Sequence, residues 1–309
     1  MRLLLHVPAN KTADEWHAAF ARELPEAELR AWAPGLDWPA DYAAFWHPPR
    51  ELLAGQTRLK AAFNLGAGVD AALKALALPP GVPLVRIEDG GMGRQMDEYV
   101  TWAVLRYFRR LDDYAAQAAR AEWKVHRPRR HAEFAVGVMG LGVLGARVAR
   151  AIAGLGFPVL GWSASPKSIE GVRSFAGAAA LDAFLAATRV LVCMLPLTPD
   201  TAGLLSRATL GKLPQGAYVV NVARGGLVVD DDLLALLDAG HLAGATLDVF
   251  NEEPLPASHR FWFHPKVFVT PHSSALTVID DSVAQVAAKI RRLELGEAVT
   301  GVVDRGRGY

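Results

Sequence analysis

The feature that most constrains this chain is a glycine-rich turn between an apolar strand pattern and an amphipathic helix pattern. The segment AVGVMGLGVLGARVARAIAGLG has the spacing GxGxxG. The first glycine permits the tight bend, the second lets the backbone approach a pyrophosphate, and the third lets the helix pack closely on the sheet. The helix N-terminus then presents free N–H groups and a positive dipole end to phosphates.

An ordinary glycine-rich turn is the alternative, but a strand, a helix and a further strand follow one another in the expected order. We therefore predict a dinucleotide site. The residues expected to contact the dinucleotide in this turn are Gly140, Leu141, Gly142, Val143, Leu144 and Gly145.

The end of the next apolar segment, residues 158–162, bears on which dinucleotide is bound. In NAD-binding units an acidic residue about 20 positions beyond the glycines holds the ribose hydroxyls. Here Ser163 takes that position, and no Asp or Glu occurs before Glu170. Ser163, Ser165 and Lys167 can instead donate hydrogen bonds and positive charge to a 2′-phosphate. These three residues favour NADP(H) over NAD. The alternative is that they are ordinary turn residues without a binding role.

Short apolar segments alternate with amphipathic ones along the whole chain, which predicts parallel sheets covered by helices. A length of 309 residues suits about two domains of roughly 150 residues each. A long helix is expected from Val100 to Tyr114, and a last one at residues 278–295. The candidate strands are residues 3–7, 42–46, 61–65, 83–87, 134–139, 158–162, 190–194, 217–221, 243–248 and 267–270.

Composition and charge argue against several classes of protein. The chain is 51% apolar and 21% charged, which supports buried cores rather than disorder. A net charge of +1 gives no overall attraction to nucleic acid or to a membrane surface, and no apolar stretch approaches the roughly 20 residues of a membrane helix. The single cysteine, Cys193, lies in an apolar run and is expected to be a buried strand residue of a cytoplasmic protein. No His, Cys or Asp cluster has the spacing of metal ligands.

Three polar segments each follow a candidate strand, at the edge where open α/β sheets bind ligands. They supply Arg224 in NVARGGLVVDDDLL, Glu253 in LDVFNEEPLP and His272 in VTPHSSA. An arginine can clamp a carboxylate or carbonyl oxygen, and a histidine can donate a proton as hydride reaches a carbonyl carbon. A carboxylate can fix the imidazole and stabilise its charged form. Such a set suits reduction of a keto acid, although each residue alone also fits a surface ion pair, a solvated loop or a cap.

With these motifs in place, the chain resembles the D-2-hydroxyacid dehydrogenase family, and most closely its branch of glyoxylate and hydroxypyruvate reductases. The resemblance covers nearly the whole chain. The family motifs in order are WHPP, LGAGVD, EDGGMGRQMDEY, FRRLDDY, MGLGVLG, GWSASPKSIEGVRSFAG, LPLTPDT, LPQGAYVVNVARGG, LDVFNEEPLP, TPHSSALT and VDRGRGY. One departure is Ser273-Ser274, where many members have Ile-Gly after the histidine.

The resemblance implies roles by position. Arg224 matches the substrate-binding arginine, Glu253 the partner of the histidine, and His272 the acid/base. In LGAGVD, Ala67 and Gly68 match the backbone amides that hold the substrate carboxylate.

Further contacts are implied for both ligands. Trp46 is expected at the substrate pocket, and Met96 near the nicotinamide. Asp248 matches a residue that contacts the nicotinamide carboxamide. The other residues expected to contact the cofactor are Leu195, Pro196, Thr201, Val222 and Ala223.

The implied architecture is α/β, with two Rossmann-like or flavodoxin-like parallel-sheet domains and a cleft between them. Residues 1–98 with 277–309 would form the substrate-binding (catalytic) domain, and residues 99–276 the dinucleotide-binding domain. A homodimer built partly on the long helix after Asp97 is also implied.

The implied activity is NADPH-dependent reduction of small 2-keto acids, glyoxylate to glycolate and hydroxypyruvate to D-glycerate. His272 would be the proton donor. An NAD-dependent dehydrogenase of the 3-phosphoglycerate type is one alternative, but it would want an acid near Ser163. A dinucleotide-sensing interaction protein of the same fold is the other, and the lack of long disordered extensions argues against it.

Overall fold

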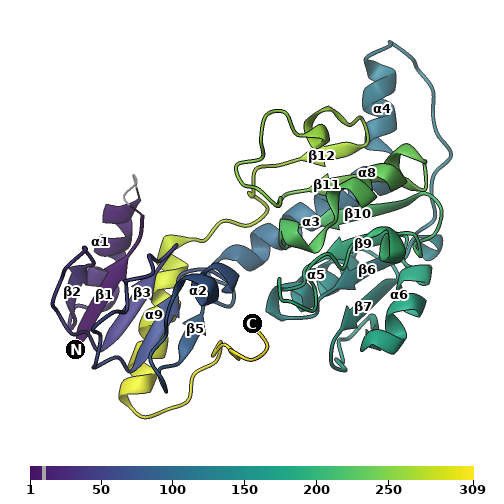
Figure 1. The fold of residues 1–309 in the computed structure, drawn as a ribbon. Coiled ribbons are helices and arrows are strands. Elements are labelled where there is room, and N and C mark those ends of the chain that lie inside the picture. The colour runs from purple at the N-terminus through teal and green to yellow at the C-terminus, as the bar shows by residue number, and fades with distance from the viewer. Residues whose placement is uncertain (9–11) are drawn as a thin grey trace. The chain divides into compact units, whose positions relative to one another are not determined.

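The computed structural model describes residues 1–8 and 12–309, which form two compact units (Figure 1). Unit 1 comprises Met1–Met92 and Leu276–Tyr309, and unit 2 comprises Gly93–Ala275. Each unit contains one β-sheet whose strands all pair in parallel. The predicted α/β class with two parallel sheets is confirmed. Within the described ranges, no helix is long and apolar enough to cross a membrane.

Unit 1 has a five-stranded sheet in the order β2-β1-β3-β4-β5, the flavodoxin-like order. Its strands are β1 (Arg2–His6), β2 (Glu28–Ala31), β3 (Tyr42–Phe45), β4 (Ala61–Asn64) and β5 (Leu84–Arg86). Its helices are α1 (Ala13–Glu23), α2 (Asp70–Ala75) and α9 (Ile279–Glu294). The strand β2 was not among the predicted strands, because this edge strand is largely exposed and lacks an apolar run.

Unit 2 has a seven-stranded sheet in the order β12-β11-β10-β9-β6-β7-β8, so the order reverses between β6 and β9. Its strands are β6 (Val136–Met139), β7 (Val159–Ser163), β8 (Val172–Ala176), β9 (Val190–Cys193), β10 (Ala217–Asn221), β11 (Leu242–Leu247) and β12 (Val267–Val269). Its α-helices are α3 (Met92–Phe108, whose first residue belongs to unit 1), α4 (Leu111–Ala118), α5 (Val143–Gly154), α6 (Leu181–Ala187), α7 (Arg207–Leu210) and α8 (Asp230–Asp238). Loops at the carboxyl ends of β6 and β9 therefore flank the point where dinucleotides bind in such sheets.

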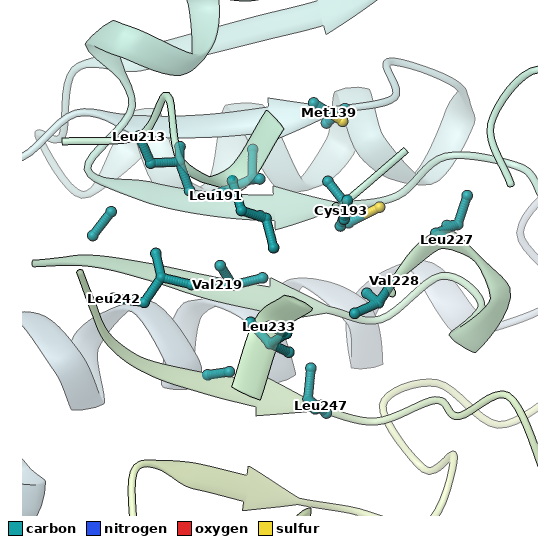
Figure 2. Close-up of a cluster of buried hydrophobic side chains, with 14 of the residues drawn as sticks. Met139, Leu191, Cys193, Leu213, Val219, Leu227, Val228, Leu233, Leu242 and Leu247 are labelled. Carbon is teal, nitrogen blue, oxygen red and sulfur yellow. The ribbon is translucent and has the colours of Figure 1, made fainter. Parts of the chain in front are cut away.

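Buried apolar side chains cover both faces of the sheet in unit 2. Leu191 and Cys193 of β9 face one cluster, which Leu233 of α8 completes (Figure 2). Val190 and Val192 face the opposite cluster, beneath α3 and α5. A strand buried on both faces reads as a continuous apolar run, which is why the central strands were predictable. Burial raises the pKa of the Cys193 thiol to about 12.

The predicted helix from residue 100 to residue 114 is wrong in its continuity. The chain forms α3 and α4 with a break at Arg110, whose φ is 58°. A left-handed residue cannot continue a right-handed helix. The apolar spacing runs through the break, so periodicity alone gave no sign of it. After the break, Leu111 is 47% exposed rather than part of the core.

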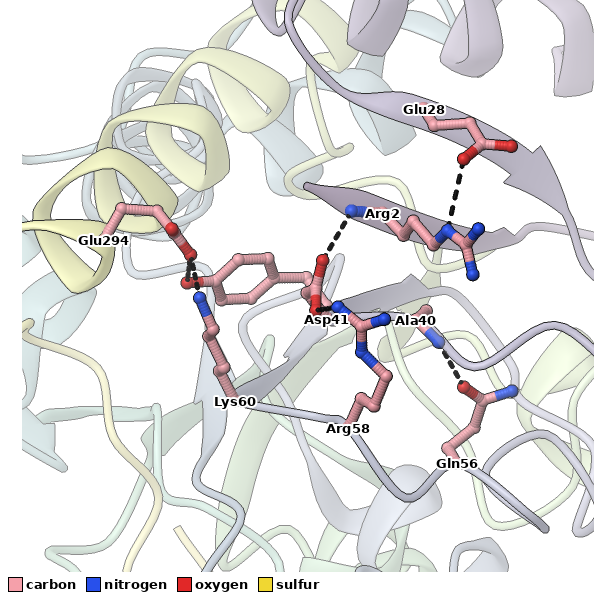
Figure 3. Close-up of polar contacts among 9 residues, drawn as sticks. Arg2, Glu28, Ala40, Asp41, Gln56, Arg58, Lys60 and Glu294 are labelled. Atoms are coloured by element: carbon pink, nitrogen blue, oxygen red, sulfur yellow. Dashed lines mark hydrogen bonds and ion pairs between the residues drawn. The ribbon is translucent and has the colours of Figure 1, made fainter.

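A polar network anchors α9 to the sheet of unit 1 (Figure 3). The Glu294 carboxylate at the end of α9 accepts hydrogen bonds from the Tyr42 hydroxyl at 2.5 Å and from Lys60 Nζ at 2.7 Å. Hydrogen bonds from these two donors lower the pKa of Glu294. In a separate contact of the same sheet, the backbone N–H of Arg2 donates to Asp41 at 2.8 Å. The C-terminal helix is thus an integral part of unit 1.

The glycines of α5 allow a matched stability test. A Cβ on Gly145 would lie 1.9 Å from the Gly140 carbonyl oxygen, whereas a Cβ on Gly154, at the end of the same helix, would meet no heavy atom within 4 Å. We expect Gly145→Ala to destabilise unit 2 by about 1 to 3 kcal/mol through overpacking, and so to lower its thermal midpoint by roughly 2 to 12 °C. Gly154→Ala should keep or slightly raise the midpoint. Calorimetry that found equal midpoints for the two variants would contradict the close contact.

Candidate active site

The glycine-rich turn lies where the strand order of unit 2 reverses. Gly140 follows β6 with a φ of 106°, and a Cβ there would come within 2.6 Å of the Met194 carbonyl oxygen beyond β9. Gly142 is the N-cap of α5, and among the described residues no side chain caps this helix. A Cβ on Gly142 would meet open space, and Val143 is 47% exposed. The turn therefore presents accessible backbone N–H groups at a helix N-terminus, which suits a phosphate group.

The turn after β7 lacks a carboxylate where the ribose of a dinucleotide would lie. Ser163 is the last residue of β7 and is buried, and its hydroxyl donates to the Ser165 carbonyl at 2.7 Å. Ser165 and Lys167 are exposed. The positive charge of Lys167 and the hydroxyl of Ser165 are thus accessible, while the hydrogen of the Ser163 hydroxyl is already used.

Arg147 of α5 is not available in the same way. Its Nε donates to Asp97 Oδ2 at 2.6 Å. This ion pair neutralises the guanidinium, so Lys167 is the better candidate to meet a 2′-phosphate.

The loop after β9 has an internal hydrogen-bond brace. Thr201 Oγ1 donates to the Pro196 carbonyl at 2.7 Å and accepts from the Thr198 N–H at 2.9 Å. Leu195 is buried at the base of this loop. The brace fixes the shape of the loop that adjoins Gly140.

Arg224 lies in the loop that follows β10. The preceding residues, Val222 and Ala223, are buried. Arg224 is half-buried, and its Nη1 donates to the Ala223 carbonyl at 2.7 Å. A Cβ on the next residue, Gly225, would come within 1.9 Å of the Phe250 carbonyl carbon. Only glycine permits this approach, which brings the loop of Arg224 against the loop that leads to Glu253.

Glu253 and His272 form a direct pair. The Nδ1 atom of His272 lies 2.7 Å from Glu253 Oε2, and the other carboxylate oxygen accepts from the Phe250 N–H at 2.9 Å. An ionised carboxylate only accepts hydrogen bonds, so Nδ1 carries a proton in this pair. Within residues 1–8 and 12–309, Nε2 makes no hydrogen bond, and the side chain is 46% exposed. Nε2 is therefore the nitrogen free to exchange a proton with a ligand.

The backbone at His272 is held in an unusual conformation. Its φ is 52°, in the left-handed region, which costs a residue with a side chain about 1 to 3 kcal/mol. The His272 N–H donates to the Asp248 carbonyl at 2.8 Å. The same N–H also donates to the Thr270 carbonyl at 3.1 Å, so both the end of β11 and the chain just before His272 stabilise this conformation.

Asp248 is fully buried, and its carboxylate accepts three hydrogen bonds. Oδ1 accepts from Thr270 Oγ1 at 2.6 Å and from the Ser273 N–H at 2.8 Å. Oδ2 accepts from the Ser274 N–H at 2.9 Å. The two serines that replace Ile-Gly thus bind through their backbone. Together with Gln95, Glu98, Tyr99 and Trp102, they line a hollow of about 340 Å³ in unit 2.

Unit 1 carries a second group of the expected residues. The side-chain amide of buried Asn64 donates to the Gly66 carbonyl at 2.8 Å and to the Gly68 carbonyl at 3.0 Å. The loop is thereby turned so that its carbonyls face Asn64, and within the described part of the chain the N–H groups of Ala67 and Gly68 donate to no atom. Trp46 packs so closely on this loop that a Cβ on Gly66 would lie 2.0 Å from the Trp46 ring.

The sequence analysis did not single out Asn64. Its signal was available, since it is the one polar residue in the apolar run 61–65, and a buried amide has to find partners. Met96 is buried in the core of unit 2, beside Val100.

Known proteins match this chain in sequence and in structure. Residues 101–274 match the family model of the D-isomer specific 2-hydroxyacid dehydrogenase, NAD binding domain. A glyoxylate/hydroxypyruvate reductase A of Serratia proteamaculans is 50% identical over 302 residues, 96% of each chain.

Two solved structures match almost the whole fold. One is a D-isomer specific 2-hydroxyacid dehydrogenase from Xanthobacter autotrophicus in complex with NADPH and MES, with a TM-score of 0.94, 40% identity and 99% coverage of both chains. The other is an NADPH-dependent glyoxylate/hydroxypyruvate reductase from Sinorhizobium meliloti in complex with NADP and sulfate. It has a TM-score of 0.93 and 39% identity, and the match covers 100% of this chain and 99% of that one.

Proposed function

Because the chain belongs to the D-isomer specific 2-hydroxyacid dehydrogenase family, we propose that it reduces glyoxylate and hydroxypyruvate with NADPH. The observation that carries this proposal is the pair of His272 and Glu253, joined at 2.7 Å, with Nε2 of the imidazole left open. The relative from Serratia proteamaculans bears the name of this activity, and the Sinorhizobium meliloti reductase was solved with NADP.

Unit 2 is proposed to be the dinucleotide-binding domain and unit 1 the substrate-binding domain. When bound, NADPH supplies the hydride. The open N-terminus of α5 fits a pyrophosphate, because Gly142 leaves room for it and no capping side chain within the described residues competes for the N–H groups. Lys167 and Ser165 would hold the 2′-phosphate, and Asp248 would lie near the nicotinamide carboxamide.

His272 is proposed to donate the proton to the carbonyl oxygen as the carbonyl carbon accepts hydride. Glu253 holds Nδ1, so Nε2 faces the substrate, and its negative charge stabilises the imidazolium that serves as the acid. After the transfer the imidazole is neutral and takes up a proton from solvent, to which the side chain is open.

Two groups are proposed to bind the substrate's carboxylate or carbonyl oxygen. In unit 2, Arg224 offers a planar fork of donors. In unit 1, the free N–H groups of Ala67 and Gly68, presented by Asn64, form an anion-binding loop beside Trp46. A crystal structure with a keto-acid analogue bound away from the loop at residues 65–70 would refute the second assignment.

A homodimer is proposed on the basis of exposed apolar residues in unit 2. Trp123 is 98% exposed and Val125 is 79% exposed in the segment after α4, and α4 stands apart from the sheet of its unit (Figure 1). Contiguous exposed apolar side chains mark interaction surfaces, and we propose that Trp123 and Val125 belong to one.

A location in the cytoplasm is proposed as well. The single cysteine, Cys193, is buried, which is consistent with a reducing compartment. Cell fractionation would test this location.

The dimer proposal predicts the effect of one charge. Trp123→Glu should weaken the dimer by about 2 kcal/mol or more, which is about thirtyfold in the dissociation constant. Light scattering after size-exclusion chromatography would report the mass across a dilution series. Leu295→Glu changes another exposed apolar residue, in unit 1 and 75% exposed, and should leave the mass unaltered. A wild type that is monomeric at all concentrations would refute the dimer.

His272→Gln is expected to lower kcat by about 10² to 10⁴, the usual contribution of a general acid. The affinity for NADPH, measured by fluorescence, should stay the same. The control His17→Gln, an exposed change on α1, should alter neither kcat nor this affinity.

Glu253→Gln removes the charge that favours the imidazolium, so the rate of reduction should decrease at a lower pH than in the wild type. A His272→Gln variant with wild-type kcat would remove the histidine from the mechanism.

A panel of keto acids run with both NADPH and NADH tests the function as a whole. We expect turnover of glyoxylate and hydroxypyruvate and a preference for NADPH of about one to two orders of magnitude in kcat/KM, from one or two charged hydrogen bonds to the 2′-phosphate. No turnover of any keto acid would favour a sensing role. Preference for a phosphorylated keto acid with NADH would favour the 3-phosphoglycerate type.

The basis of the cofactor preference is tested at one position. Ser163→Asp should narrow or reverse the ratio by repelling the 2′-phosphate. Ser163→Ala is the matched control and should keep the ratio, because the serine hydrogen is bound to the Ser165 carbonyl. Lys167→Ala should narrow the ratio by loss of attraction. Equal efficiency of the wild type with both cofactors would defeat this prediction.

A further inference from the structure

We propose that Tyr99 is a positioning residue for His272, acting through Thr270 and the buried carboxylate of Asp248. The proposal rests on the proposed function in one respect, the role of His272 as proton donor. Tyr99 lies on α3, and Thr270 directly follows β12, so the two belong to elements far apart in the sequence.

Tyr99, Thr270 and Asp248 form one continuous chain of side-chain hydrogen bonds. The Tyr99 hydroxyl lies 2.5 Å from Thr270 Oγ1, which lies 2.6 Å from Asp248 Oδ1. A threonine hydroxyl has one hydrogen, and the Asp248 carboxylate only accepts, so Thr270 donates to Asp248. Tyr99 must then donate to Thr270. The direction of the whole relay is therefore fixed, and each donor has one acceptor.

The relay ends on the backbone that carries His272. Asp248 accepts from the N–H groups of Ser273 and Ser274, and its own carbonyl accepts from the His272 N–H. These three bonds bracket a residue whose φ is 52°. A carboxylate that was free to turn would release two of them, and the left-handed backbone at His272 would lose its support. Thr270 prevents that rotation by occupying Oδ1, and Tyr99 in turn orients the Thr270 hydroxyl.

Tyr99 remains protonated, and so a donor, at neutral pH. Burial raises the pKa of Tyr99 to about 12, with the nearby charge of Asp248 acting in the same direction. Tyr218 also raises the pKa of Tyr99, while the positive charge of Arg106 acts in the opposite direction. The phenol therefore stays protonated and the relay does not switch.

Unit 2 contains a second tyrosine–threonine pair that serves as a control. The Tyr218 hydroxyl lies 2.9 Å from Thr246 Oγ1, and both residues are buried. Within residues 1–8 and 12–309, neither hydroxyl of this pair hydrogen-bonds to Asp248 or to the segment of His272. Deletion of either tyrosine hydroxyl removes one bond of the same kind, but only that of Tyr99 belongs to the relay.

The kinetic experiment compares variants that keep or remove a single hydroxyl. Thr270→Val removes the hydroxyl of the relay but keeps nearly the same side-chain shape, whereas Thr270→Ser keeps the hydroxyl. We expect kcat for glyoxylate to fall about three- to tenfold in Thr270→Val and in Tyr99→Phe, the factor that corresponds to one hydrogen bond. KM for NADPH should be unchanged. Thr270→Ser and Tyr218→Phe should retain wild-type kcat, even where their thermal midpoints fall.

A spectroscopic readout makes the test independent of turnover. In ¹⁵N-histidine-labelled protein, the shifts of the two ring nitrogens report which one carries the proton of neutral His272, and His272→Gln assigns the signals. The wild type, Thr270→Ser and Tyr218→Phe should show the Nδ1–H form that Glu253 holds. Thr270→Val and Tyr99→Phe should shift toward a mixture of the two forms, because a loosened ring loses its fixed partner.

The outcomes separate the two claims. Wild-type ring shifts in both Thr270→Val and Tyr99→Phe would overturn the relay, whatever their activity. The expected contrast in ring shifts, combined with a wild type that reduces no keto acid, would uphold the positioning and sink the proposed function alone. A loss of kcat in Tyr218→Phe equal to that in Tyr99→Phe would also overturn the relay, since it would reduce the effect to general destabilisation.

Discussion

Both sheets of this protein are wholly parallel, and that constraint decides where its polar residues gather. A parallel strand can be followed by its neighbour only after a crossover, so every carboxyl end opens on the same edge of the sheet. In unit 2 this edge receives the glycine turn after β6 and the loops of Arg224, Glu253 and His272. Residues spread over 130 positions of sequence thus reach one edge without any long loop being needed.

The edge would be of little use if its loops were free to move, and buried polar groups provide the rigidity. In unit 2 the Asp248 carboxylate lies beneath the segment of His272 and accepts three hydrogen bonds. In unit 1 the Asn64 amide binds two carbonyls of the glycine loop. A buried polar group without partners is costly, so each of these side chains defines one arrangement of the loop above it. Neither Asp248 nor Asn64 has to touch a ligand to define what the site can bind.

The sequence was sufficient to predict the central strands and the strand ends from which the candidate-site loops begin, but not the contacts between distant elements. The strands β6, β9 and β10 have continuous apolar runs, whereas the edge strands β2 and β8 carry exposed polar residues and were missed. The helix break at Arg110 depends on one left-handed residue within an unbroken apolar spacing. Apolar periodicity indicates which face of a helix is buried, but it does not indicate the backbone dihedral angles of a single residue.

Tyr99 and Thr270 illustrate the same limit within the candidate site. They are 171 positions apart, and nothing local to either residue indicates the other. The placement of Arg224, Glu253 and His272 after strands could be predicted, because each lies in a recognisable motif. A supporting hydrogen bond has no such signature, since any hydroxyl in the right place will serve.

Unit 1 is built from both ends of the chain, and this has a consequence for synthesis on the ribosome. Unit 2 is one uninterrupted stretch, Gly93–Ala275, and its last residue is made before any of α9. Until α9 arrives, Tyr42 lacks its Glu294 partner and the apolar face of α1 lacks the helix that packs against it. Unit 1, whose synthesis begins first, therefore completes its folding last and keeps apolar surface exposed until α9 is made. Unit 2 can fold before that point. Premature termination near residue 275 would leave a complete unit 2 attached to an unfinished unit 1 with exposed apolar surface, which chaperones would be expected to bind.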